Sequence, residues 1–455
     1  METAALTELR LTEFKTFSDE VLDLGELTIL IGRNGAGKSN ALDGLEVLSR
    51  MVGADDLVQA LDGRRHGDPS VRGGSQGLPP HGSNVFALGC TVRFGGDDIH
   101  YDVRVRVSPT PHILSEKLVG PLKMLESNTW RQGKTLFETI PRDDPQPFLE
   151  AAINNGRRGG TNPSRPFRDH RPILTQIIST LPGEDDAERA VLKAAEAVRS
   201  ALRSIFHLDP VPHLMRGYVR AQDADLSRTA DNLSAAAKDL RQKHPDRFAR
   251  LTELIREVAD SSVEQLDFIG TDLNEVMLCL VERGPDALTS STPAREISDG
   301  LLRFIAVATS LLAGRNLDVD AVSPRLITTT DGEEIISGEV LLVIEELENG
   351  LHPSQAGRVL ELLRSSAAEE GKRVLLTTHN PALLNRVRGE LRRSVTVCHR
   401  DDRGWSRLTP LVDMPDYLDA AASRGVGTAI SEGMLSGEAP DEPDYAEFDR
   451  LIGIG

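Results

Sequence analysis

The feature that most constrains the fold is the segment LTILIGRNGAGKSN at residues 27–40. The mainly apolar run LTILI at residues 27–31 predicts a buried strand, and apolar residues recur at helical spacing after the glycine-rich turn. The turn itself matches the pattern G-x-x-x-x-G-K-[ST]. An ordinary glycine turn is the alternative, but the strand before it and the Lys-Ser after it favour a phosphate-binding loop.

In such a loop the backbone N–H groups and the helix N-terminus point at a phosphate. Lys38 would add a positive charge, and the Ser39 hydroxyl would ligate Mg²⁺. The residues expected to bind the nucleotide are Asn34, Gly35, Gly37, Lys38, Ser39 and Asn40. The loop alone does not distinguish a kinase, a GTPase and an ATPase, so other segments have to decide.

A second segment, EVLLVIEELENGLHP at residues 339–353, contains a short apolar run that ends in two glutamates. The run predicts a strand of parallel-sheet character, and open α/β sheets bind ligands at the carboxyl ends of such strands. Glu345 would then hold Mg²⁺ through water, and Glu346 would orient and deprotonate an attacking water. Paired glutamates can also be a solvated helix start, a reading that the phosphate loop disfavours.

The segment RVLLTTHNP at residues 373–381 predicts another buried strand, which ends at His379. A histidine in this place is often structural. Here it follows the glutamate strand by one expected helix, a spacing that sets neighbouring strand ends side by side. We therefore expect His379 to reach a γ-phosphate.

A fourth segment, REISDGLLRFIAVATSLLAG at residues 295–314, predicts an apolar helix that begins near Ser298, Asp299 and Gly300. Ser298 or Asp299 can serve simply as the N-cap. A serine, a glycine and a helix N-terminus can also form an anion site.

These four segments, in this order, resemble the phosphate loop, signature motif, Walker B strand with its D-loop, and H-loop of ABC-type ATPases. GKSN, SDGLLR, ENGLHP and the opening LTEFKTF (residues 11–17) are similar to the SMC/RecF-like branch, in particular to stand-alone ATPases related to the OLD family. The resemblance covers most of the chain and is weakest over residues 126–175.

The resemblance implies ATP and Mg²⁺ as ligands and a head-to-tail homodimer in which each signature completes the other subunit's site. Ser298 and Gly300 would then bind the γ-phosphate in trans, and Asn349 and His352 would lie on the D-loop. In addition, the family pattern suggests Lys15 near a phosphate and Gln76 as the glutamine-loop ligand of the metal. Two positions depart from the pattern, because Glu345 replaces an aspartate and Leu347 replaces a proline.

Composition limits the partners and the compartment. The formal net charge of -18 at pH 7 would repel nucleic acid unless basic residues cluster. Three widely spaced cysteines argue against a disulfide framework and a zinc site. No apolar run approaches the roughly 18 residues that a membrane span requires. We expect a soluble, cytoplasmic protein without membrane contact.

We expect four parts, within an α/β ABC-type P-loop NTPase head that has an antiparallel β side sheet and an inserted helical lobe. They are the N-terminal half of the head at 1–125, the helical lobe at 126–260, the C-terminal half of the head at 261–412, and an acidic tail at 413–455. Period-2 runs such as HYDVRVRV predict the side sheet. AERAVLKAAEAVRSALRSIF and FARLTELIREV predict helices.

One stretch inside the expected insertion is strongly basic: GRRGGTNPSRPFRDHRP, at residues 156–172. It is either a solvated loop or a flexible lid that meets DNA phosphates or an acidic partner. The arginines concerned are Arg157, Arg158, Arg165, Arg168 and Arg171.

Two functional hypotheses remain. The chain is an ATP-hydrolysing switch in anti-phage defence or DNA repair that controls a separate effector such as a nuclease or toxin, or it is a nucleotide-sensing scaffold with negligible turnover. An OLD-type nuclease needs a further metal-binding domain, and the approximately 76 residues after His379 are too few for one.

Overall fold

The centre of the fold is a parallel sheet whose strands come from distant parts of the chain. Their spatial order is β10 (Ile205–Leu208), β17 (Val340–Ile344), β18 (Lys372–Thr378), β3 (Leu27–Ile31) and β19 (Val395–Arg400). The three strands predicted around residues 27–31, 340–344 and 374–377 are therefore confirmed. The computed structural model describes residues 2–63, 70–141, 148–159, 161–259, 263–284, 288–313, 317, 326–329, 332–346, 360, 362–364, 372–380, 385 and 389–414.

Both faces of this parallel sheet are buried, which explains its uninterrupted apolar strands. Leu30 of β3 points into one hydrophobic cluster, and Ile29 and Ile31 point into another. β17 alternates in the same way, because Leu341 and Val343 belong to the first cluster while its other three residues belong to the second. A strand covered on both sides reads as a continuous hydrophobic run.

The sheet continues beyond β19 into a long antiparallel side sheet. The next strands in space are β20 (Ser406–Pro410), β2 (Phe17–Asp23), β1 (Glu2–Phe14), β4 (Val85–Phe94), β5 (Asp97–Arg106), β6 (His112–Met124), β7 (Thr129–Thr139), β8 (Phe148–Ile153) and β9 (Ser164–Arg168). A short hairpin, β15 (Leu326–Thr329) and β16 (Gly332–Gly338), pairs with the start of β1. The predicted antiparallel side sheet is confirmed.

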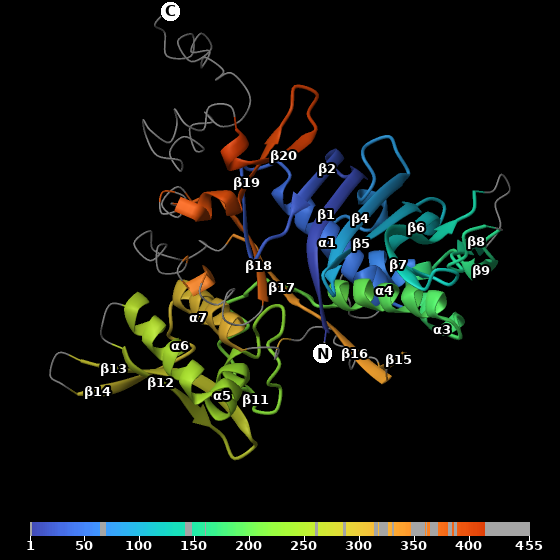
Figure 1. The fold of residues 1–455 in the computed structure, drawn as a ribbon. Coiled ribbons are helices and arrows are strands. Elements are labelled where there is room, and N and C mark those ends of the chain that lie inside the picture. Colours follow the sequence, from blue (N-terminus) through green and yellow to red (C-terminus); the bar gives the residue numbers. More distant parts are fainter. Residues whose placement is uncertain are drawn as a thin grey trace, which may run out of the picture.

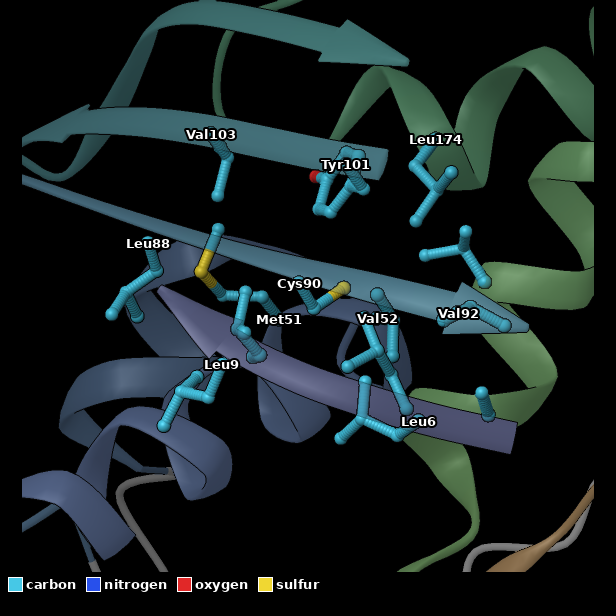
Figure 2. Packing of buried hydrophobic residues seen from close by; sticks show 14 of the residues in the cluster. Leu6, Leu9, Met51, Val52, Leu88, Cys90, Val92, Tyr101, Val103 and Leu174 are labelled. Carbon is cyan, nitrogen blue, oxygen red and sulfur yellow. The ribbon is translucent and has the colours of Figure 1, made fainter. Parts of the chain in front are cut away.

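One face of the side sheet packs on helices. These are α1 (Lys38–Gly53), α2 (Leu57–Asp62), α3 (Ile173–Thr180) and α4 (Asp186–Arg203). Figure 2 shows Met51 and Val52 of α1 beside Leu6 and Leu9 of β1 and Cys90 of β4, all of them nearly inaccessible.

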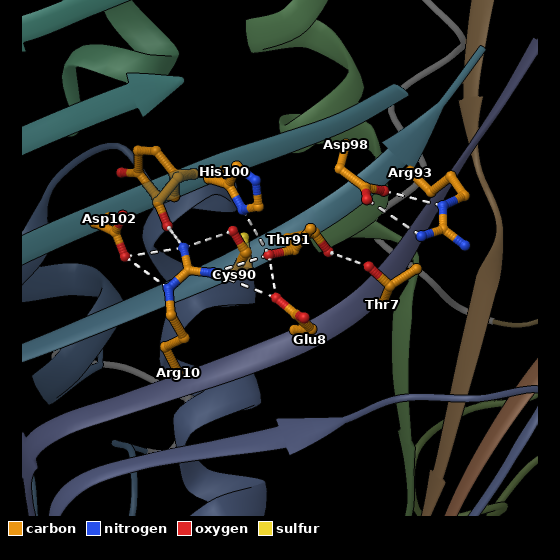
Figure 3. A network of polar contacts seen from close by, with 10 residues as sticks. Thr7, Glu8, Arg10, Cys90, Thr91, Arg93, Asp98, His100 and Asp102 are labelled. Atoms are coloured by element: carbon orange, nitrogen blue, oxygen red, sulfur yellow. Dashed lines mark hydrogen bonds and ion pairs between the residues drawn. The ribbon is translucent and has the colours of Figure 1, made fainter. Parts of the chain in front are cut away.

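The outer face of the same sheet carries a polar network centred on Arg10 (Figure 3). Its guanidinium donates to Asp102 Oδ1 at 2.9 Å and to Thr91 Oγ1 at 2.8 Å. It also donates to the carbonyl oxygens of Cys90 and Tyr101. The network joins β1, β4 and β5 (Figure 3).

A second lobe packs on the other face of the parallel sheet (Figure 1). It contains α5 (Leu233–Lys243), α6 (Pro245–Val258) and α7 (Asp299–Leu312), with a small sheet of β11 (Val219–Arg220), β12 (Val263–Gly270), β13 (Glu275–Arg283) and β14 (Thr289–Pro293). At the start of β18, the buried Lys372 donates to the carbonyl oxygens of Ser310 and Leu311 at the end of α7. Such a cation suits the negative end of a helix dipole.

Helices occupy a smaller part of residues 126–260 than the sequence predicted. The helices over AERAVLKAAEAVRSALR and FARLTELIREV are confirmed as parts of α4 and α6, but residues 205–208 form β10 and not the end of a helix. Residues 129–168 contribute three strands to the side sheet, where we had predicted helix. The basic stretch is not a loop throughout, since β9 occupies residues 164–168. The predicted tail, residues 413–455, lies outside the described residues except for its first two positions.

Among the described residues, no helix combines the length and the apolar character needed to cross a membrane.

Candidate functional site

The glycine loop between β3 and α1 depends on backbone conformations that side chains disfavour. Gly32, Gly35 and Gly37 have φ values of 149°, 78° and 122°. A Cβ on Gly32 would collide with the carbonyl oxygen of Cys398 in β19. A Cβ on Gly37 would collide with the hydroxyl of Ser406 in β20. Gly32 and Gly37 therefore allow the loop to run close against these two strands.

Side chains of β19 and β20 hold the glycine loop by hydrogen bonds. Arg400 donates to the carbonyl oxygen of Gly35 at 2.9 Å, and the Ser406 hydroxyl donates to that of Ala36 at 2.5 Å. The Cys398 thiol also donates to Ala36. These bonds therefore fix the carbonyl oxygens of Gly35 and Ala36 on the side of the loop that faces β19 and β20.

The start of α1 has the character of an anion site. Gly37 occupies the N-cap without a side-chain cap, and the first turn contains no acidic residue. Lys38 is almost fully buried and donates to the carbonyl oxygens of Gly32 and Arg33 at 2.7 and 3.1 Å. Ser39 is half-buried, and the Asn40 amide donates to the Thr16 hydroxyl at 2.8 Å. An uncapped helix N-terminus beside a lysine favours bound phosphate.

Strand register sets Glu345 and Glu346 at the same edge of the sheet. Ile344 pairs with Leu376, and Thr378 pairs with Ile31, so the glutamates, His379 and the glycine loop all follow the paired ends of adjacent strands. Glu346 has a φ of 46°, and its N–H donates to the Thr377 hydroxyl at 3.0 Å. Backbone strain of this kind is concentrated at functional sites.

Glu345 lies among several charges. Its Oε1 is 3.4 Å from Arg72 Nη2, and Asp209 and Asp43 act on it electrostatically. Burial raises the pKa of Glu345, Arg72 lowers it, and the two aspartates raise it further. Asp209 comes directly after Leu208, which pairs with Ile344, so the register of β10 places it next to Glu345.

A second charge cluster lies on α1 behind the loop. Glu46 accepts from Arg50 at 2.6 Å and from Arg228 at 2.8 Å. Burial would raise the pKa of Glu46, but Arg228, His207 and Arg50 together lower it to about 2. Burial lowers the pKa of His207 to about 4. The cluster connects α1 to the segment that leads into the second lobe.

Lys15 and Gln76 contact other protein groups, and their contacts with a phosphate and a metal stay predictions. Lys15 donates to Asp43 Oδ2 at 2.6 Å and to the carbonyl oxygen of Arg72 at 2.9 Å. The Gln76 amide donates to the carbonyl oxygen of Val107 at 3.0 Å. In the same loop, the side chain that reaches Glu345 is that of Arg72, which the sequence did not single out.

The remaining predicted residues are placed as follows. His379 is exposed at the end of β18. Ser298 is an exposed N-cap of α7 and accepts from the Leu301 N–H at 3.3 Å, whereas Gly300 is buried. The capping role of Ser298 is confirmed, and its contact with a phosphate stays a prediction. Asn349 and His352 lie outside the described residues.

The donor set fits Mg²⁺. This ion is held in proteins by one or two carboxylates together with substrate phosphates. The partly exposed carboxylate of Glu345 and the Ser39 hydroxyl follow nearby strand ends and supply such donors. Within the described part of the chain, no group of three or more His, Cys, Asp or Glu side chains could form an all-protein cage for a metal.

A buried parallel sheet, a strand–glycine loop–helix unit ending in Lys-Ser, and a carboxylate strand at the same edge define a P-loop NTPase head of the α/β class. The chain belongs to a family of P-loop ATPases described as "AAA domain, putative AbiEii toxin, Type IV TA system", whose model matches residues 27–385. A search of curated proteins gave no match.

Solved SMC head domains are among the similar structures. One, in complex with the C-winged helix domain of ScpA, is 12% identical, covers 89% of this chain and 97% of its own, and has a TM-score of 0.46. The SMC head domain from Thermotoga maritima is 13% identical, with coverages of 89% and 98% and a TM-score of 0.40. A head with an extended coiled coil, bound to a ScpA domain derived from Pyrococcus furiosus, is 11% identical, with coverages of 92% and 100% and a TM-score of 0.44.

Proposed function

We propose that this chain binds ATP with Mg²⁺ at the carboxyl edge of the parallel sheet and hydrolyses it. The observation that carries the proposal is the shared edge. Strand register brings the glycine loop, Glu345, Glu346 and His379 to the ends of three adjacent strands. In open α/β sheets this edge is where ligands bind.

The roles of the side chains follow from their places. Lys38 and the amides at the start of α1 would hold the β- and γ-phosphates, and Glu346 would orient a water and accept its proton. His379 would donate to the γ-phosphate. When bound by Glu345 and Ser39, Mg²⁺ neutralises charge on the phosphate oxygens. Glu346 is exposed and held in a left-handed conformation, which suits a base that meets substrate only on binding.

We further propose that two copies pack head to tail, so that Ser298 and Gly300 of one complete the phosphate site of the other. Support comes from the start of α7, where Ser298 is exposed beside a helix N-terminus. Asn349 and His352 would lie at the same interface. An exposed, positively polarised helix end can meet a partner's γ-phosphate without any further rearrangement of charge.

The process in which such a switch acts is defence or DNA metabolism, with a nuclease or toxin as the controlled effector. The family description names a toxin of a type IV toxin–antitoxin system, which supports a role in defence. Arg157 and Arg158 are exposed and would be the first basic residues to meet DNA. A scaffold that senses nucleotide without turnover is the competing function.

Glu346→Gln tests hydrolysis. The variant should lose about 100-fold to 10,000-fold in phosphate release, the usual contribution of a general base. It should also accumulate as a dimer in ATP and Mg²⁺, measured by light scattering after gel filtration. If the variant releases phosphate at the wild-type rate, the scaffold is the better description.

A mixing experiment tests the trans site. Lys38→Met removes the loop charge and Ser298→Arg blocks the signature, so each variant alone should be inactive. In a 1:1 mixture, half of the dimers are mixed and each contains one intact site, so about a quarter of the wild-type rate should return. No recovery from two folded variants would contradict head-to-tail completion.

A further inference from the structure

The loop at residues 70–78 is held by hydrogen bonds from Lys15, which is itself fixed on α1 by a buried ion pair. Lys15 Nζ contacts Asp43 Oδ2 at 2.6 Å, and the two side chains are only 9% and 4% exposed. The same Nζ donates to the carbonyl oxygen of Arg72, and the Lys15 N–H donates to that of Leu78 at 2.7 Å. These two hydrogen bonds from Lys15 hold the backbone around Arg72 in place.

The Arg72 side chain, in contrast, is held weakly. It is 56% exposed, with its Nη2 3.4 Å from Glu345 Oε1 and its Nε 3.8 Å from Asp43 Oδ1. Such long, exposed ion pairs contribute little stability and break easily. A firmly anchored backbone thus presents a loosely paired guanidinium to the carboxylate that the proposed function assigns to Mg²⁺.

A guanidinium and a divalent metal ion repel each other, so each weakens the attraction of the other to the same carboxylate. We propose that Arg72 is an internal counter-cation of Glu345 that competes with Mg²⁺, and thereby sets the Mg²⁺ concentration at which nucleotide is bound tightly. The inference rests on the proposed function, since it takes Glu345 as the metal ligand. Arg72 is a positioning residue here, because it acts through Glu345 and not on the phosphates.

The physical benefit is charge balance in the absence of nucleotide. Glu345, Asp43 and Asp209 are three acids in one region, and Lys15 is already paired with Asp43. Arg72 offsets the repulsion felt by Glu345 and gives way to a divalent ion, whose stronger field outweighs a screened pair.

The test is a Mg²⁺ titration of binding of the fluorescent nucleotide mant-ADP, which requires no hydrolysis. Arg72→Met should lower the midpoint Mg²⁺ concentration about 2-fold to 5-fold, the range that an exposed ion pair accounts for. With EDTA in place of Mg²⁺, the affinity of Arg72→Met for mant-ADP should equal that of the wild type. Arg93→Met is the matched control, because Arg93 is 58% exposed and pairs with Asp98 on the side sheet.

An unchanged midpoint in Arg72→Met would overturn the proposal, as would a weaker affinity in EDTA, which would make Arg72 a phosphate ligand. In a Glu345→Gln background, Arg72→Met should produce no further shift, since the competed group is gone. If mant-ADP binding by the wild type does not depend on Mg²⁺, the proposed function fails together with this inference.

Discussion

Two polar networks in this molecule are built on opposite principles. On the side sheet, Arg10 donates to four partners at 2.8 to 3.0 Å, and Thr91 links Glu8 to His100 (Figure 3). At the carboxyl edge of the parallel sheet, Glu346 has a left-handed backbone and Arg72 approaches Glu345 only to 3.4 Å.

The difference follows from where the residues lie. Arg10, Thr91 and Asp102 lie within regular antiparallel strands, so pairing fixes the distances between them. Residues just beyond the ends of parallel strands have no such pairing to fix the distances between them. A network of short hydrogen bonds stabilises the fold, whereas the long ion pair between Arg72 and Glu345 can exchange partners with a ligand.

Gly32→Ala, a change at the carboxyl edge of the parallel sheet, should have the largest effect on nucleotide affinity and on stability. The new Cβ would meet the Cys398 carbonyl oxygen, and the backbone φ of 149° disfavours any side chain. We expect nucleotide affinity to fall about 100-fold or more, together with a loss of about 2 to 4 kcal/mol in the free energy of unfolding. Fluorescence titration and urea unfolding would measure these two quantities.

Gly35→Ala is the matched control in the same loop. Nothing lies within 4 Å of a Cβ at Gly35, so only the strain of its φ of 78° remains. A cost of about 1 kcal/mol is expected. Equal losses from both variants would show that close approach to β19 is not what Gly32 provides.

Glu116 provides a pH-dependent comparison inside the side sheet. Its buried carboxyl accepts from the N–H groups of Ile173 and Leu174 at the start of α3 and from the Tyr101 hydroxyl. Burial raises the pKa of Glu116 from 4.5 to about 7, although these hydrogen bonds lower it. The folded state therefore retains a proton that the unfolded state has released between these pH values.

The free energy of unfolding should consequently fall by about 3 kcal/mol from this group as pH rises from about 4.5 to about 7. Urea unfolding at pH 5 and pH 7.5 would measure the change, and Glu116→Gln should remove that part of it. A Glu116→Gln variant with the wild-type pH dependence would show that the carboxyl does not titrate in this range.

Arg10→Met should lower the free energy of unfolding without affecting the carboxyl edge of the parallel sheet. It leaves the Cys90 and Tyr101 carbonyl oxygens and Asp102 without this donor. Because Arg10 and Asp102 are 22% and 52% exposed, we expect a loss of about 1 to 2 kcal/mol in the free energy of unfolding. Nucleotide affinity should be unchanged, and a tenfold change would indicate that the two networks are coupled.

The smallest effect on stability is expected from the double variant Arg157→Ala and Arg158→Ala. Both side chains are exposed, so the free energy of unfolding should change by less than about 0.5 kcal/mol. If they contact DNA, the salt dependence of binding should become shallower by about two counterions. Arg165→Ala is a useful comparison, because Arg165 lies 3.7 Å from Glu188 and is partly neutralised.

Local sequence patterns predicted most of the strands and helices that form the carboxyl edge of the parallel sheet. A strand, a glycine turn and a capped helix are each specified within a few residues, which is why β3, α1, β17, β18 and α7 were found. β7 was missed because it lies near the outer end of the sheet. Its first five residues are exposed, so the period-2 pattern of buried residues is nearly absent.

The residues around Glu345 could not be predicted in the same way. Arg72 and Glu345 are 273 positions apart, and no local periodicity reports such a contact. Asp209 follows a four-residue strand where the sequence predicts the end of a helix, so its place beside Glu345 depends on a strand pairing that the sequence does not reveal. An apolar run that ends in Asp-Pro, as in IFHLDP, was the available signal.

The bracing of the glycine loop by β19 and β20 has a consequence for the order of events during synthesis. β3 lies between β18 and β19, whose residues follow it by roughly 340 positions, about 20 to 70 s of translation. Until then, Gly35 and Ala36 lack the strands that hold their carbonyl oxygens. If the loop binds ATP as proposed, we expect a nascent or truncated polypeptide without β19 and β20 to bind ATP more weakly than the complete head.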